Sequence, residues 1–120
     1  MLLLAALQPS SYGAELALET VRHSVETNVV VIFSHSQCHR SERTKAYFED
    51  LGVPYFSLEL DTRADGAELK KALSELTGSR FVPSVFVNGQ HVGGSAETER
   101  AYRTGELEHW VSSERVRAQG

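Results

Sequence analysis

The sequence contains one cysteine, Cys38, and that scarcity excludes a framework of disulfide bonds within the chain. It contains no apolar stretch near the roughly 18 residues that a membrane-spanning helix requires. An excess of basic residues is also missing, because 12 Lys and Arg stand against 16 Asp and Glu and leave a formal net charge of −4. Such a balance does not attract nucleic acid or an anionic membrane, and we expect neither as a partner.

The composition is that of one small globular domain. A chain of 120 residues, of which 41% are hydrophobic and 23% are charged, can bury a single core. No repeat or linker divides it, so we expect a domain over residues 15–113 between an N-terminal extension (1–14) and a C-terminal tail (114–120). The extension opens with the apolar run Met1–Leu7, which resembles the centre of a signal peptide but lacks the basic residues that precede one. We therefore expect a cytoplasmic protein.

Helical and strand-like segments alternate along the chain. The pattern predicts a loop over 9–13, a helix that ends near residue 27, and further helices over 39–51 and 67–77. It predicts strands over 29–34 and 54–60 and a hairpin of 85–87 and 90–92. A last helical region is expected over 97–111, with a candidate break at Gly105. Asn88-Gly89 favours a type I′ turn in the hairpin, because both residues tolerate positive φ angles. A helical crossover makes the first two strands parallel, whereas the hairpin strands are antiparallel. The order predicts an α/β protein with a four-stranded mixed sheet flanked by helices.

Cys38 lies at the turn from a strand to a helix. It follows the β-branched run that ends at Phe33 and a short polar loop, and a helical pattern begins at His39. Unpaired N–H groups and the positive end of the helix dipole favour an anion at such a turn. Because the thiolate is the nucleophile, this placement predicts a lowered pKa and a reactive sulfur. The alternative is that a lone cysteine serves as a small buried apolar residue.

Several motifs follow one another in the order and spacing of a known family. They are Val30–Ser34 before Cys38, then Leu58–Asp61, Asp65–Gly66, Leu73–Gly78, Arg80–Pro83, Val85–Gly89 and His91–Gly94. Together they resemble the glutaredoxins, thiol oxidoreductases that use glutathione, over roughly residues 20–110. Val53–Phe56 and the region of Ala101-Tyr102 are also similar to glutaredoxin domains fused to thioredoxin reductases in animals. The resemblance implies a thioredoxin-like fold.

The resemblance also implies roles for individual residues. Cys38 is then the nucleophile, and Pro83 is a cis proline that turns the backbone of Val82 toward the sulfur. The residues implied to bind glutathione are Gln37, Lys70, Val82, Pro83, Gly94, Ser95 and Glu97. Taken without the resemblance, Pro83 is expected to be a trans proline that opens a strand. The diglycine is then equally an ordinary turn, and Lys70 is equally a solvated helix residue.

The departures from the family pattern concern the thiol. Ser41 stands where many glutaredoxins have a second cysteine, so the active-site motif is Cys-His-Arg-Ser and an outside thiol must resolve any mixed disulfide. His35 replaces the usual lysine, which leaves thiolate stabilisation to Arg40, to His35 and to the helix N-terminus. Ala96 replaces the aspartate that engages the γ-glutamyl amine of glutathione, and Glu97 stands one residue further on.

These features imply a glutathione-dependent thiol-disulfide oxidoreductase of redox homeostasis and electron transport. Its substrates are then glutathionylated proteins or small disulfides, reduced by a monothiol mechanism with glutathione as co-substrate, and we expect a monomer. One alternative is a binding or regulatory module whose catalysis is weakened. Another, not favoured, is a dimer that holds an iron–sulfur cluster through Cys38 and glutathione thiolates. The five histidines form no recognisable ligand set, so we predict no metal site.

Overall fold

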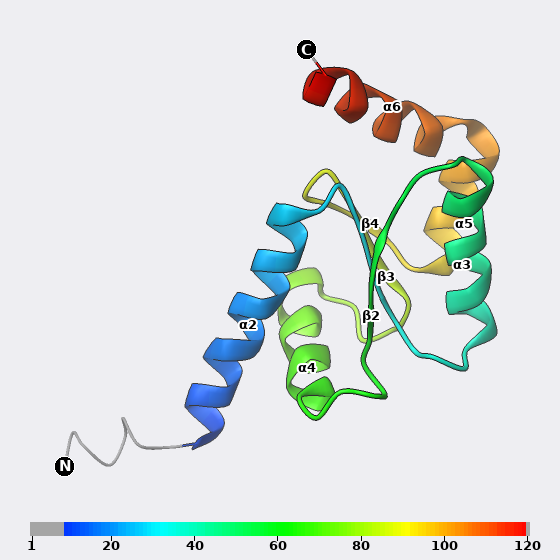
Figure 1. The fold of residues 1–120 in the computed structure, drawn as a ribbon. Coiled ribbons are helices and arrows are strands. Elements are labelled where there is room, and N and C mark those ends of the chain that lie inside the picture. Colours follow the sequence, from blue (N-terminus) through cyan, green and yellow to red (C-terminus); the bar gives the residue numbers. More distant parts are fainter. Residues whose placement is uncertain (1–8, 120) are drawn as a thin grey trace.

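The structure is a computed structural model that describes residues 9–119, with side chains from 12 to 112. It contains helices and strands in alternation (Figure 1). In chain order these are α2 (Pro9–Thr27), β1 (Val30–Ser34), α3 (His39–Asp50), β2 (Phe56–Glu59), α4 (Gly66–Thr77), β3 (Ser84–Val87), β4 (Gln90–Gly93), α5 (Ser95–Thr104) and α6 (Glu106–Gln119).

The four strands form one mixed sheet in the order β2-β1-β3-β4. β1 pairs in parallel with β2, and β3 pairs antiparallel with both β1 and β4. Every residue of β1 is buried, as expected for a central strand covered on both faces. The predicted α/β fold with a thioredoxin-like mixed sheet is confirmed.

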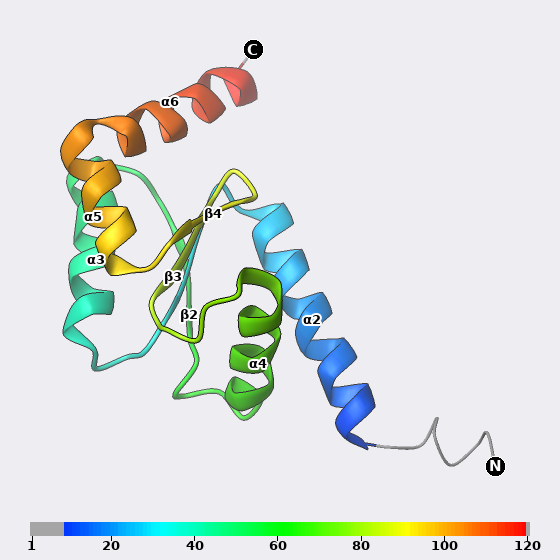
Figure 2. The ribbon, with the colours of Figure 1, turned by 180° about the vertical axis from the view of Figure 1, so that it is seen from behind.

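Helices cover both faces of the sheet. α2 and α4 lie on one face and α3 and α5 on the other, while α6 continues from α5 beyond the end of the strands (Figures 1 and 2). Successive residues of β1 point to opposite faces. Val31 and Phe33 join the cluster under α2 and α4, and Val30 and Ile32 join the cluster under α3, α5 and α6. The core is therefore two apolar layers separated by the sheet.

The loop predicted over residues 9–13 is wrong, because α2 begins at Pro9. Proline is compatible with the first turn of a helix, where its missing N–H has no partner to lose. Gly13 also lies inside α2, beside α4, where an added Cβ would be 3.9 Å from Cγ of Glu68. Packing of α2 along α4 thus outweighs the local turn signal. Residues 1–8 lie outside the described part of the chain.

The other predicted boundaries are close to the observed ones. β2 begins at Phe56 rather than at residue 54, and β4 continues to Gly93. The predicted turn is confirmed by positive φ angles of 54° at Asn88 and 78° at Gly89. Gly105, with φ of 86°, divides the last helical region into α5 and α6.

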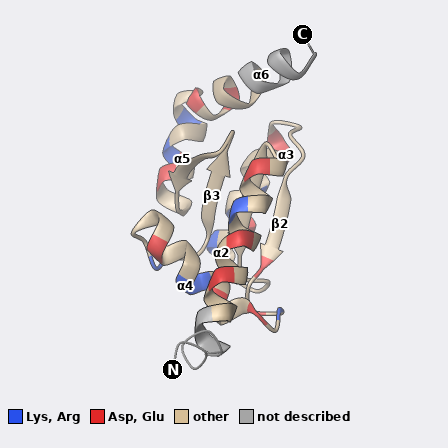
Figure 3. Ribbon diagram, turned by 90° about the vertical axis from the view of Figure 1, so that its left-hand side faces the viewer, with Lys and Arg blue, Asp and Glu red and all other residues tan. Residues whose placement is uncertain are grey.

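Along the ribbons of α2 and α4, acidic and basic residues are intermixed (Figure 3). A surface with both signs interspersed creates no extended field that would attract a polyanion. Among the helices that the structure describes, none is long and apolar enough to cross a membrane.

Candidate active site around Cys38

Cys38 is the N-cap residue of α3 and is partly exposed. Its backbone is extended (φ −114°, ψ 123°), and its carbonyl accepts the N–H of Glu42 at 3.0 Å. Hydrogen bonds hold the pKa of the Cys38 thiol below its ordinary value. The backbone N–H of Ser41 lowers this pKa most, and partial burial raises it. The Ser41 hydroxyl, the Arg40 N–H and the Arg40 charge lower it further. This direction agrees with the lowered Cys38 pKa that the strand-to-helix turn predicts.

The loop before Cys38 is held by side chains on two sides. Asp61, just after β2, accepts the Ser36 N–H at 2.9 Å and the Ser36 hydroxyl at 2.6 Å. Ser41 Oγ, fully buried, accepts the His35 N–H at 3.3 Å. The Ser36 hydroxyl and then its N–H hold the pKa of Asp61 low, so this carboxylate stays ionised at neutral pH. These bonds fix the path of the chain from β1 to the thiol.

A carboxylate beneath the loop joins α3 to the sheet. Glu59 accepts hydrogen bonds from Ser34 Oγ at 2.7 Å and from Ser57 Oγ, and it pairs with Lys45 Nζ at 2.8 Å. Burial disfavours the charged carboxylate, but the bonds from Lys45, Ser57 and Ser34 outweigh it and lower the pKa of Glu59. The helix that begins at Cys38 is thereby tied to β1 and β2.

The Val82–Pro83 peptide bond is cis, as the resemblance implied. Ser84 pairs with Phe33 in the register of β3 with β1, which places the start of β3 beside the end of β1. Cys38 follows the same end of β1. The cis proline and the thiol therefore lie at the same end of the sheet.

The diglycine approaches the cis proline closely. A Cβ added to Gly94 would lie 3.3 Å from the carbonyl oxygen of Pro83, and one added to Gly93 would lie 2.8 Å from Cβ of Glu97. Gly93 also has a φ angle of 130°, which strongly favours glycine. Glu97 Oε1 accepts the Gly94 N–H at 2.8 Å at the start of α5. Its carboxylate thus caps the helix, and a contact between Glu97 and glutathione stays a prediction.

The remaining predicted site residues lie on the surface of this end or on α4. Gln37 is exposed in the loop before the thiol, Ser95 is the first residue of α5, and Lys70 is exposed on α4. The charge of Arg40 acts on the Cys38 thiol, whereas that of His35 acts on Asp61. A role for His35 in stabilising the thiolate stays a prediction.

The sequence interpretation missed the residues that position the thiol. Asp61 and Glu59 fall in a motif that carries the family resemblance, but the sequence does not pair them with Ser36 and Lys45. Asp61 and Ser36 are 25 residues apart, and Glu59 and Lys45 are 14 apart. Polar residues at the ends of two parallel strands were the available signal, since such ends meet at one edge of a sheet.

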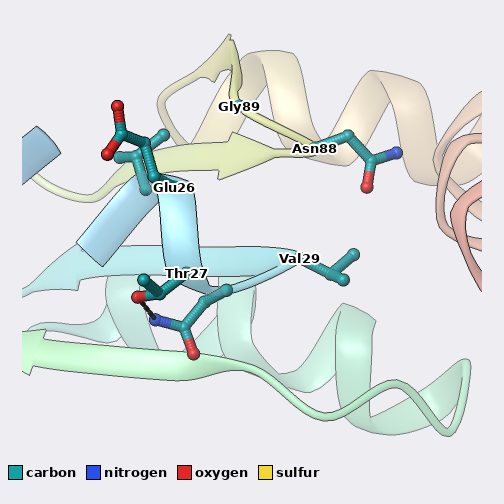
Figure 4. Close-up of a pocket in the computed structure, with 7 residues that line it drawn as sticks. Glu26, Thr27, Val29, Asn88 and Gly89 are labelled. Atoms are coloured by element: carbon teal, nitrogen blue, oxygen red, sulfur yellow. Dashed lines mark hydrogen bonds between the residues drawn. The ribbon is translucent and has the colours of Figure 1, made fainter. Parts of the chain in front are cut away.

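A surface pocket of about 280 Å³ lies elsewhere, between the end of α2 and the β3–β4 turn (Figure 4). It is lined by Val25, Glu26, Thr27, Asn28, Val29, Asn88 and Gly89. Val29 precedes β1 and Cys38 follows it, so the pocket and the thiol are at opposite ends of the strand. Over the described residues, no three His, Cys, Asp or Glu side chains gather as a metal site would require.

The fold and the thiol at the start of α3 define a thioredoxin-like protein of thiol-disulfide chemistry. The family model "Glutaredoxin" matches residues 30–92. Glutaredoxin-C8 of Oryza sativa subsp. japonica is 44% identical over 110 residues, covering 89% of this chain and 80% of that protein. Glutaredoxin-C4 of Arabidopsis thaliana is 40% identical over 98 residues, covering 82% and 73%.

A solved structure agrees with these relatives. The crystal structure of a buckwheat glutaredoxin–glutathione complex superposes with a TM-score of 0.85 at 34% identity, covering 88% of this chain and 96% of that one. The chain belongs to the glutaredoxin family. Membership supports a thiol-disulfide oxidoreductase role in general.

Proposed function

We propose that this protein reduces mixed disulfides between glutathione and protein thiols by a monothiol mechanism. The observation that carries the proposal is the geometry of Cys38. Cys38 is the N-cap residue of α3, the N–H groups of Ser41 and Arg40 lower the pKa of its thiol, and the side chain three residues further on is a serine hydroxyl. A thiolate is favoured there, and no second thiol is within the chain to compete for it.

Two kinds of relative support this assignment. Monothiol glutaredoxin-S6 of Oryza sativa subsp. japonica is 44% identical over 88 residues and covers 73% of this chain. The buckwheat relative was solved as a complex with glutathione. We extend both properties, the monothiol route and the glutathione ligand, to the present chain.

The reaction then proceeds in two exchanges. The Cys38 thiolate attacks the glutathione sulfur of the mixed disulfide, an S–S bond forms between Cys38 and glutathione, and the protein thiolate leaves and takes a proton from water. A second glutathione thiolate attacks the sulfur of the bound glutathione, releasing glutathione disulfide and the Cys38 thiolate. One glutathione thiol is consumed in each cycle: its sulfur is oxidised to the disulfide level as the sulfur of the substrate protein is reduced to a thiol, and Ser41 takes no part in electron transfer.

The end of the sheet offers groups suited to glutathione. The backbone of Val82, which precedes the cis bond, would pair with the extended tripeptide, and Gly94 would leave room for its γ-glutamyl end. Lys70 would attract the glycine carboxylate, and Gln37 and Ser95 would add hydrogen bonds. The expected cytoplasmic monomer, and the alternatives of a binding module and an iron–sulfur dimer, stay predictions.

A single-turnover experiment tests the mechanism. Reduced protein is mixed with a glutathionylated peptide in the absence of free glutathione, and products are measured by mass spectrometry. We expect peptide thiol to appear with glutathionylated Cys38, which accumulates because no internal thiol can resolve it. Cys38→Ser should release no peptide. Free glutathione released in the first turnover, or peptide release by Cys38→Ser, would contradict the monothiol route.

A further inference from the structure

Phe81 is the most exposed large apolar side chain of this end of the molecule. It is 74% exposed, whereas Phe33 and Phe48 are fully buried and Phe86 is 8% exposed. Phe56, at the start of β2, is 42% exposed. A phenylalanine left mostly in water forgoes the stabilisation that its burial would bring. Phe81 therefore offers an apolar contact to a partner that binds at the Cys38 end of the sheet.

The chain around Phe81 holds it in place by short polar contacts. Its N–H donates to Ser79 Oγ at 3.3 Å, and the Ser79 N–H donates to Thr77 Oγ1 at 3.2 Å. On the other side, Val82 packs against the apolar cluster under α2 and α4, and the cis bond to Pro83 follows. The segment is tied at both ends, and the ring of Phe81 stays outside the core.

The position of Phe81 is at the border of the proposed glutathione site. It directly precedes Val82, whose backbone would hold the tripeptide, and the start of β3 lies at the same end of the sheet as Cys38. A small disulfide would extend little beyond that site. A protein carrying a glutathionylated cysteine brings further polypeptide to its border, where exposed aromatic residues supply much of the binding energy of interfaces.

We propose that Phe81 is a docking contact for the polypeptide of a protein–glutathione mixed disulfide, against apolar side chains that flank the modified cysteine. It therefore sets a preference for protein substrates over small disulfides. This inference rests on the proposed function and adds the substrate class to it.

The experiment compares two exposed phenylalanines with two substrates. Wild type, Phe81→Ala and Phe56→Ala are assayed with glutathionylated serum albumin and with the mixed disulfide of glutathione and cysteamine. Phe56 is the matched control, because the register of β2 with β1 places it at the end away from Cys38. Phe81→Tyr keeps the aromatic ring, and circular dichroism verifies the fold of each variant.

For Phe81→Ala we expect kcat/KM on the albumin substrate to fall about five-fold, the effect of truncating a typical interface side chain. The loss should lie in KM, with kcat unchanged, and the cysteamine substrate should stay within about two-fold of wild type. Phe81→Tyr and Phe56→Ala should behave as wild type on both substrates.

Two outcomes would overturn the inference alone: an active wild type with no loss on albumin in Phe81→Ala, or an equal loss on both substrates. The second result would assign Phe81 to the glutathione site itself. A wild type inactive on both substrates would instead contradict the proposed function, and the inference with it.

Discussion

At the end of the sheet that carries Cys38, two carboxylates accept hydrogen bonds that hold the loop and α3, whereas at the opposite end backbone carbonyls accept the hydrogen bonds of Asn88. Asp61 and Glu59 accept bonds from Ser36, Ser34 and Lys45 beside the thiol. At the far end, Asn88 donates its backbone N–H to the Val29 carbonyl at 2.8 Å and its side-chain N–H to the Trp110 carbonyl at 3.0 Å.

The two kinds of acceptor have different consequences. Backbone carbonyls do not titrate, so the strength of the hydrogen bonds at the far end does not depend on the charge of their acceptors at any pH. Carboxylates carry a charge near the thiol and lose it in acid. The stability contributed by the Cys38 end should therefore change with pH and with substitution of its charged residues. The stability contributed by the far end should change only when an individual hydrogen bond is removed.

The largest effect should come from Glu59→Ala. It leaves Lys45, 18% exposed at its side chain, without its ion-pair partner, and we expect a loss of about 2 kcal/mol in the free energy of unfolding. Urea denaturation measures it. The double variant Glu59→Ala with Lys45→Met should regain part of the loss, since no unpaired ammonium remains. Equal stability of the single variant and wild type would show that the pair contributes nothing.

At the far end, two substitutions of Asn88 separate a hydrogen bond from backbone strain. Asn88→Gly removes the bond to Trp110 but suits the φ angle of 54°, and we expect a loss of about 1 kcal/mol. Asn88→Ala adds the strain of a positive φ and should cost about 1 kcal/mol more. The rate of Cys38 alkylation should not change in either variant. A slower alkylation would show that the two ends are coupled.

Asp61→Ala should act on the thiol more than on stability. Without the two bonds to Ser36 the loop before Cys38 is released, and we expect turnover to fall roughly three- to ten-fold through misplacement of the sulfur. Ser36→Ala, which removes only the hydroxyl bond, should lose less. The assay is reduction of a glutathionylated peptide, with urea denaturation in parallel. Unchanged turnover in Asp61→Ala would show that Asp61 does not position the thiol.

The smallest effect is a pH dependence of stability confined to the Cys38 end. The bonds from Lys45, Ser57 and Ser34 hold the folded-state pKa of Glu59 below its ordinary value of 4.5. Its contribution to stability is therefore complete above about pH 4.5 and is lost as pH falls through the folded-state pKa. We expect the urea midpoint to decrease from pH 5 to pH 3. In Glu59→Gln the decrease should be shallower, whereas Asn88→Gly should keep the slope of wild type. The same slope in Glu59→Gln as in wild type would assign the pH dependence to other groups.

The sequence predicted the elements well where a local signal was strong. The β-branched run of β1, the stop of α4 at Gly78 and the Asn88-Gly89 turn all follow from properties of adjacent residues, and each is found. The error over residues 9–13 arose because Pro9 is compatible with both a loop and a helix start. Only the packing of α2 on α4 decides between them.

For the site, the sequence located the thiol but not its supports. Cys38 at the start of α3 and the cis bond before Pro83 were predicted, the first from local pattern and the second from family resemblance. Ser41 is predicted chiefly as the replacement of a second cysteine, and it is buried, accepts the N–H of His35 in the loop and lowers the pKa of the Cys38 thiol. That role depends on the turn into α3, which brings Ser41 back toward the sulfur.

By itself, the sequence determined the fold class, the single thiol and its place at the start of a helix, because these depend on residue type and short-range spacing. The tertiary structure decided that Asp61 holds the loop at Ser36, that Glu59 holds α3 through Lys45, and that Phe81 stays exposed. Such contacts join residues that only the crossing of strands and loops brings together. Their geometry is therefore a property of the folded chain.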